Sequence, residues 1–138
     1  MAHTVSYPCR HPLVLHPKGN LGTSIVRPWI EVLVTIGTSS HKVFCLVDTG
    51  ADDTVLDLAT AITLGVNHLA PLQVSVTGVG SGATLHSEPN VRLDFAGGTV
   101  TVSVLFGSVT VPVLGRRALL DAGHKIEFGF DATAWHHT

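Results

Sequence analysis

Residues 29–36 (WIEVLVTI) place apolar side chains at every second position, and residues 43–47 form an unbroken apolar run. Alternation is typical of a half-buried strand, and a short apolar run is typical of a buried one. The small polar residues between them, from Gly37 to Ser40, are typical of a turn. The pattern therefore predicts a hairpin of strands 29–36 and 41–47, whose second strand ends at Asp48.

The remaining chain consists of short apolar segments separated by glycines. Two more hairpins are expected, one from residues 72–77 and 83–87 around a glycine-rich tip, and one from residues 91–95 and 99–106 around Gly97-Gly98. A strand is also expected at residues 109–114, and another from the alternation at residues 126–130. Short helices are expected at residues 57–64 and 117–122, each ended by a glycine. The fold class predicted is an all-β domain with two short helices.

The two ends of the chain lack this regularity. Residues 1–24 are rich in His, Pro and Gly, which predicts a flexible leader or pro-segment that self-cleavage could remove. We expect the folded domain to span residues 25–131 and residues 132–138 to form a tail, with a mobile His136-His137 pair.

Composition restricts the function classes. A chain of 138 residues with 45% hydrophobic and 13% charged residues fits one ordered domain. Its formal net charge is −2 and it has no Lys/Arg cluster, so nucleic acid and anionic membranes are not expected partners. No apolar stretch is long enough to cross a bilayer, and the N-terminus has no secretory pattern. This favours the cytoplasm, although a fragment of a longer precursor would look the same.

Histidine and cysteine offer no clear metal site. The nine His residues are dispersed, and Cys9, His11 and His16 match no zinc spacing, so neither a metal nor a cofactor is expected. For Cys45 we favour a buried thiol over a disulfide with Cys9. His86 could tune a pH response, but an ordinary exposed histidine is the simpler interpretation.

The strongest candidate for chemistry is Asp48, which follows the apolar run and precedes Thr49-Gly50. Gly50 allows a tight turn that brings backbone close to the acid. Two carboxyl groups that share one proton can supply both the base and the acid of peptide hydrolysis. The triplet Asp-Thr-Gly occurs once, so a second carboxyl would have to come from another chain across a two-fold axis. The alternative is an ordinary strand-end turn.

The surrounding residues favour the catalytic interpretation. Residues 46–56 (LVDTGADDTVL) closely resemble the active-site signature of the retroviral protease, or retropepsin, family. Residues 113–116 (VLGR), followed by a predicted helix, resemble its second signature. The glycine-rich tip at residues 78–82 lies where the family has its flap, but its sequence differs from the viral flap. The resemblance covers roughly residues 27–130 and implies a retropepsin-like acid protease fold.

The resemblance also implies a role for each matching position. Asp48 would be the catalytic aspartate, with Thr49 bracing the partner subunit and Gly50 accepting from substrate backbone. Asp52 would contact substrate backbone and pair with Arg116, which with Gly115 supports the dimer. The side-chain subsites would be formed by Asp53, Val55, Val111 and Val113. The flap tip would be formed by Gly78, Val79 and Gly80.

The function expected is that of a homodimeric aspartic endopeptidase acting on an extended polypeptide. Because Ala51 has no hydroxyl to bond the carboxylate, we expect a pH optimum nearer mild acid than that of pepsin-like enzymes. Two rivals remain: a retropepsin-fold binding or dimerisation module without turnover, and an unrelated β-barrel with a chance triplet. Both signatures are present, which favours the enzyme.

Overall fold

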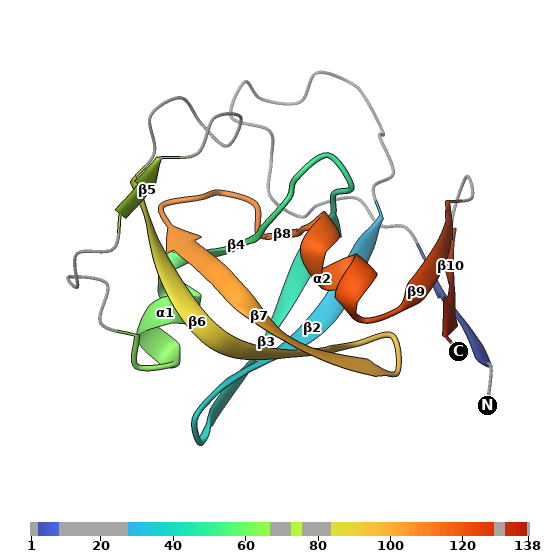
Figure 1. Ribbon diagram of the computed structural model, residues 1–138, viewed down its shortest axis with the longest axis horizontal. Coiled ribbons are helices and arrows are strands. Elements are labelled where there is room, and N and C mark those ends of the chain that lie inside the picture. The colour runs from blue at the N-terminus through green and yellow to red at the C-terminus, as the bar shows by residue number, and fades with distance from the viewer. Residues whose placement is uncertain (1–2, 9–27, 67–72, 76–83, 129–131, 138) are drawn as a thin grey trace.

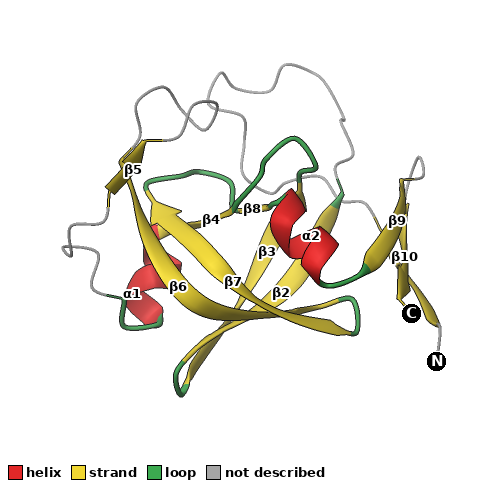
Figure 2. Cartoon of the chain, viewed as in Figure 1, coloured by secondary structure: helices red, strands yellow, loops and turns green. Residues whose placement is uncertain are grey.

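Strands dominate the computed structural model, which describes residues 3–8, 28–66, 73–75, 84–128 and 132–137 (Figures 1 and 2). The strands are β1 (His3–Pro8), β2 (Trp29–Ile36), β3 (Ser39–Val47), β4 (Thr54–Asp57), β5 (Gln73–Ser75), β6 (Thr84–Phe95), β7 (Gly98–Gly107), β8 (Val113–Leu114), β9 (His124–Phe128) and β10 (Ala132–His137). The helices are α1 (Leu58–Thr63) and α2 (Arg116–Asp121). The prediction of an all-β fold with two short helices is confirmed.

The predicted first hairpin forms as β2 and β3, which pair antiparallel from Trp29 opposite Leu46 to Ile36 opposite Ser39. Gly37 has φ +59° in the turn, a conformation that glycine adopts without steric cost. Every second residue faces the core, because side chains of a strand alternate between its faces. The buried ones are Ile30, Val32 and Val34 on β2 and Val43, Cys45 and Val47 on β3.

Seven strands form one sheet in the order β2-β3-β8-β4-β7-β6-β5, and an additional pairing of β2 with β6 closes it into a ring (Figure 1). The two-residue strand β8 lies between β3, to which it is parallel, and β4. Closure leaves few strand edges exposed. The pairing of β8 with β3 places β8 directly beside the end of the strand that leads to Asp48.

A β-bulge in β6 divides the apolar residues of the ring into two groups. The pairing of β6 with β7 shifts register between Glu88 and Val91, and Asn90 there has φ +59°. An extra residue reverses which face the following side chains occupy. Leu85, before the bulge, packs in a small cluster, whereas Val91, after it, packs in the main core.

The small group, here called the second cluster, contains the buried residues Val55, Leu85, Leu105 and Val113. Leu46, Ala51 and Val109 pack against it and are partly exposed. Since Leu46 and Ala51 flank the Asp48 turn in sequence, the chain on both sides of that turn packs against the second cluster. The main core occupies the opposite face of β7 through residues such as Val104 and Phe106.

The two ends of the chain meet in a three-stranded sheet of order β1-β10-β9. His3 pairs with His137 and Pro8 with Ala132, so the first and last strands run antiparallel (Figure 1). Trp135 of β10 is fully buried, and its ring contacts that of Phe95 edge-on with centroids 5.8 Å apart. The sequence led us to expect a loosely ordered leader and a mobile end. Within these segments, residues 3–8 form β1 and residues 132–137 form β10, because β10 packs into the core and gives β1 a paired edge. Residues 9–24 of the expected leader lie outside the described residues.

Other elements differ in extent from the predictions. Residues 83–87 and 91–95, expected as separate segments, belong to the single strand β6. Of the apolar run at residues 109–114, only Val113–Leu114 pairs as a strand. Both predicted helices are confirmed, and Gly65 and Gly123, which follow them, have φ +73°. Helices commonly end at a glycine in this left-handed conformation.

Candidate active site

Asp48 lies immediately after β3, where that strand runs alongside β8. Leu46 pairs with Val113 and Val47 with Leu114. The ladder continues one residue further, because the amide of Asp48 donates a hydrogen bond to the carbonyl oxygen of Leu114 at 3.1 Å. The two segments singled out in the sequence, 67 residues apart at their first positions, are therefore hydrogen-bonded neighbours at the site.

A tight turn orients the Asp48 side chain. The amide of Gly50 donates to Asp48 Oδ1 at 2.9 Å, and the amide of Ala51 donates to the Asp48 carbonyl at 3.3 Å. A Cβ atom added at Gly50 would lie 3.2 Å from Asp48 Oδ1, a tight contact that glycine avoids. Asp48 is half-buried, and Thr49 and Gly50 are exposed. One carboxyl oxygen is thus fixed by backbone while the residue stays accessible from outside.

The valines predicted to form subsites lie near this turn. Val55 and Val113 face each other in an antiparallel bridge and are buried in the second cluster, with 2% and 7% of their surface exposed. Val111 is half-buried. The structure thus brings Val55 and Val113 together next to Asp48, and their contact with substrate stays a prediction.

Gly115 lies directly against the segment that follows the Asp48 turn. A Cβ atom at this position would come within 2.3 Å of the Asp53 carbonyl oxygen and 2.9 Å of the Thr54 amide. The Gly115 amide donates to Thr54 Oγ1 at 3.1 Å, and Thr54 is only 2% exposed. No other residue fits at position 115 without moving the backbone of Asp53.

Two arginines at the start of α2 bind two aspartates of the same segment. Arg116 Nη2 donates to Asp52 Oδ1 at 2.6 Å, and Arg117 Nε donates to Asp53 Oδ1 at 3.2 Å. Backbone bonds reinforce both contacts, since the amide of Arg116 donates to the Ala51 carbonyl at 2.7 Å and that of Arg117 to the Asp52 carbonyl at 3.0 Å. Each of the first two residues of α2 is therefore bonded through both its backbone and its side chain to residues 51–53.

The family resemblance implied the pair of Asp52 with Arg116, which the structure forms. The pair of Asp53 with Arg117 was not predicted. The sequence did contain a signal for this second pair, because Asp52 and Asp53 are adjacent and so are Arg116 and Arg117, which follow Gly115. With 39% to 68% of these four side chains exposed, each pair contributes roughly 0.2–1 kcal/mol to stability. The backbone bonds fix the geometry, and the ion pairs set the charge around it.

The flap positions Gly78, Val79 and Gly80 lie outside the described residues. The base of this hairpin is described, where Gln73 of β5 pairs with His86 of β6. His86 is buried, and its Nε2 lies 2.9 Å from Glu88 Oε2. The interpretation of His86 as an ordinary exposed residue is wrong, because its β6 position faces inward beside β7. Its influence on pH response stays a prediction.

Cys45 is a free, buried thiol, as predicted. Burial raises its pKa far above the usual value, and the charge of Asp57 adds to the effect. Within the described ranges, no group of three or more His, Cys, Asp or Glu side chains is placed to hold a metal ion. The helices in those ranges are also too short or too polar to cross a membrane.

A comparison with known protein families gives an independent result. The family model described as "Retroviral aspartyl protease" matches residues 25–127. The matched range contains both signature segments, the second cluster and both helices. It covers most of the chain and leaves out β1 and β10.

Proposed function

Because this chain belongs to the retroviral aspartyl protease family, we propose that two copies of it form one aspartic endopeptidase. The observation that carries the proposal is the geometry of Asp48. Its backbone is bonded to Leu114 of the second signature, and its carboxylate is bonded to the Gly50 amide in an accessible turn. A carboxyl group held in this way is oriented before substrate arrives, as general acid–base catalysis requires.

The second catalytic carboxyl comes from the Asp48 of a partner copy. The sequence has a single Asp-Thr-Gly triplet, and Asp52 and Asp53, the nearest acids along the chain, are bonded to arginines. A two-fold axis beside the Asp48 turn brings two equivalent carboxyls together. Two such groups a few ångströms apart share one proton, because like charges at that distance disfavour double ionisation.

Hydrolysis then follows from the shared proton. The ionised Asp48 removes a proton from a water molecule, which attacks the scissile carbonyl carbon. The protonated Asp48 of the partner donates to the carbonyl oxygen, and later proton transfer to the nitrogen releases the amine product. Thr49 bonds to the partner's turn and Gly50 receives substrate backbone. The attacking water supplies one proton and the shared carboxyl proton is the other, and the two Asp48 side chains carry both, so the mechanism needs no metal or cofactor.

The substrate is an extended polypeptide bound as an added strand. Asp52 contacts its backbone, and Asp53, Val55, Val111 and Val113 line the pockets for its side chains. The hairpin whose base is β5 and β6 closes over it through Gly78, Val79 and Gly80. Of this hairpin the structure describes the base, where Gln73 to Ser75 of β5 pair with β6.

The partner copy approaches through the face formed by α2 and β9. Leu120 of α2 and Phe128 of β9 are 67% and 52% exposed, so a partner packed on this face would bury apolar surface. β9 is an edge strand of the terminal sheet. Gly115 and Arg116 support this face indirectly, by fixing the start of α2 against Asp52 and Asp53.

The proposal is tested by incubating the protein with a diverse peptide mixture and identifying products by mass spectrometry. Wild type should cleave internal peptide bonds, and Asp48→Asn, which keeps the shape but cannot share the proton, should not. Glu31→Gln removes an exposed carboxylate on β2, away from the proposed dimer face, and should cleave like wild type. Equal cleavage by the wild type and Asp48→Asn would contradict the proposal. Absence of cleavage by a folded wild-type dimer would favour the binding-module alternative.

A further inference from the structure

Arg117 lies next to the candidate active site but belongs to neither of the two signature segments. Its Nε lies 3.2 Å from Asp53 Oδ1, whereas the neighbouring Arg116 contacts Asp52. Asp53 is the less exposed of the two acids, with 39% of its side chain accessible against 68% for Asp52. The Asp53 carboxylate is thus partly enclosed and already occupied by a cation before any substrate binds.

This contact changes the charge that the segment offers to a ligand. Two carboxylates and two guanidinium groups lie on it, so their formal charges cancel. Asp53 alone would attract a basic side chain, and the bound Arg117 opposes that attraction. A guanidinium has five N–H donors, and the contact with Asp53 uses the one on Nε. The donors on the terminal nitrogens are left for an acceptor, and 61% of the Arg117 side chain is exposed.

We propose that Arg117 determines charge specificity, favouring substrates with an acidic or amide side chain in the subsite lined by Asp53 over those with a basic one. The proposal rests on the function proposed above and names the substrate class of that same site. Arg117 acts by holding the Asp53 carboxylate and by presenting its own N–H groups to the substrate. A lysine in the substrate must instead displace Arg117 from Asp53 and is repelled by it.

The test is a set of peptides that share one cleavable sequence and carry Gln, Glu or Lys at a single position, varied along both sides of the cleaved bond. For wild type, kcat/KM should be higher for Glu than for Lys at the position that Asp53 contacts. In Arg117→Gln the ratio of Glu to Lys should fall by about two- to fivefold, because one opposing charge is lost. Arg117→Lys keeps the charge and should retain part of the preference. In Asp53→Asn the preference for Glu should increase.

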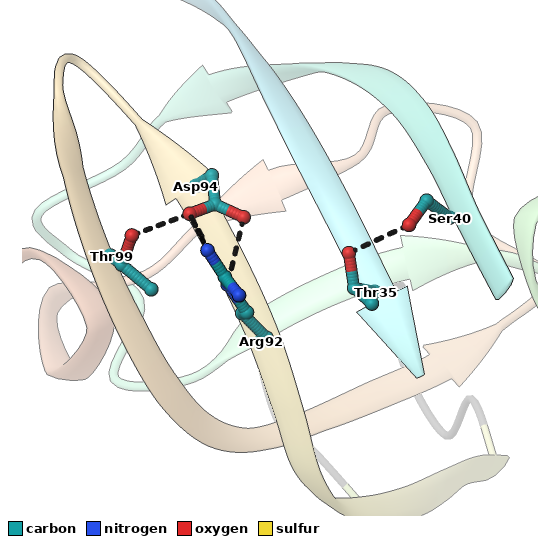
Figure 3. A network of polar contacts seen from close by, with 5 residues as sticks. All are labelled: Thr35, Ser40, Arg92, Asp94 and Thr99. Atoms are coloured by element: carbon teal, nitrogen blue, oxygen red, sulfur yellow. Dashed lines mark hydrogen bonds and ion pairs between the residues drawn. The ribbon is translucent and has the colours of Figure 1, made fainter. Parts of the chain in front are cut away.

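Arg92→Gln is the matched control. Arg92 is an exposed arginine that also binds an aspartate, Asp94, which in turn accepts a hydrogen bond from Thr99 (Figure 3). Its removal changes the net charge of the protein equally and should leave the ratio unchanged. An unchanged ratio in Arg117→Gln at every position, or an equal change in Arg92→Gln, would overturn the inference while the Gln peptides are still cleaved. If wild type fails to cleave even those Gln peptides, the proposed function is wrong and the inference falls with it.

Discussion

The α-carbon of Gly115 lies so close to Asp53 that a methyl group on it would come within 2.3 Å of the Asp53 carbonyl oxygen. The clash is with backbone, which cannot rotate away as a side chain can. It links the start of α2 to the segment that leaves the Asp48 turn, so the two signatures depend on each other for their positions.

Gly115→Ala should therefore displace residues 52–54 and reduce both stability and catalysis. We expect the free energy of unfolding to fall by about 3 kcal/mol, as for severe overpacking. Denaturant titration and kcat/KM per folded molecule measure the two effects. Gly65→Ala is the control, because φ there is +73° but no atom lies within 4 Å of the added methyl. It should cost about 1–2 kcal/mol from backbone strain alone and leave catalysis intact.

The last strand should be essential to the stability of the domain. Trp135 is fully buried, contacts Phe95 and donates from Nε1 to Thr133 Oγ1 at 2.9 Å. Trp135→Ala should lower the free energy of unfolding by about 3–5 kcal/mol, the range for truncating a buried aromatic residue. Phe44→Ala, which truncates a half-exposed aromatic on β3 outside the proposed dimer face, should cost far less. Similar losses in the two variants would show that β10 does not pack on the core.

Cys45 should be unreactive in the native protein. The thiolate is the reactive form, and a raised pKa keeps this thiol protonated at pH 8. In a Cys9→Ser background, iodoacetamide should label Cys45 only after unfolding. The unfolded thiol ionises above about pH 8.5 while the native one does not, so its contribution to stability is lost as pH rises through that range. Rapid labelling of the folded protein would contradict the burial of Cys45.

Position 51 should control the pH optimum. Ala51 adjoins Asp48, to whose carbonyl its amide donates, and it has no hydroxyl to bond the carboxylates. Ala51→Ser supplies a donor that favours the ionised form, so the pH of maximal kcat/KM should shift toward acid. Ala59→Ser, at an exposed position in α1, should leave the profile unchanged. A shift toward neutral pH in Ala51→Ser would contradict this role.

The sequence was informative where local pattern and tertiary structure agree. The alternation at residues 29–36 and the glycines that end both helices predicted those elements closely. Short strands were harder, because β8 has two residues and exists only through its neighbours β3 and β4. The strands at the two ends were not predicted, since β1 depends on pairing with a strand more than a hundred residues away. Neither segment shows an alternation of apolar and polar residues as long as the one that predicted the strand at residues 29–36.

The candidate site shows the same division. Asp48, Gly115 and Arg116 were identified because their signatures are contiguous in sequence. The contact of Arg117 with Asp53 was not, because it depends on which side of the six-residue helix α2 faces the segment after the Asp48 turn. The inward orientation of His86 was also missed, since a bulge further along β6 reverses the faces of that strand.

The central claim is that one active site takes an Asp48 from each of two copies, and mixing of subunits tests it most directly. Wild type and Asp48→Asn would be unfolded together, refolded at varying ratios with total protein constant, and assayed on one peptide. A shared site predicts that activity falls with the square of the wild-type fraction, because each mixed dimer has lost half of its dyad. Activity that falls in simple proportion to the wild-type fraction would show that each copy works alone, and would contradict the account.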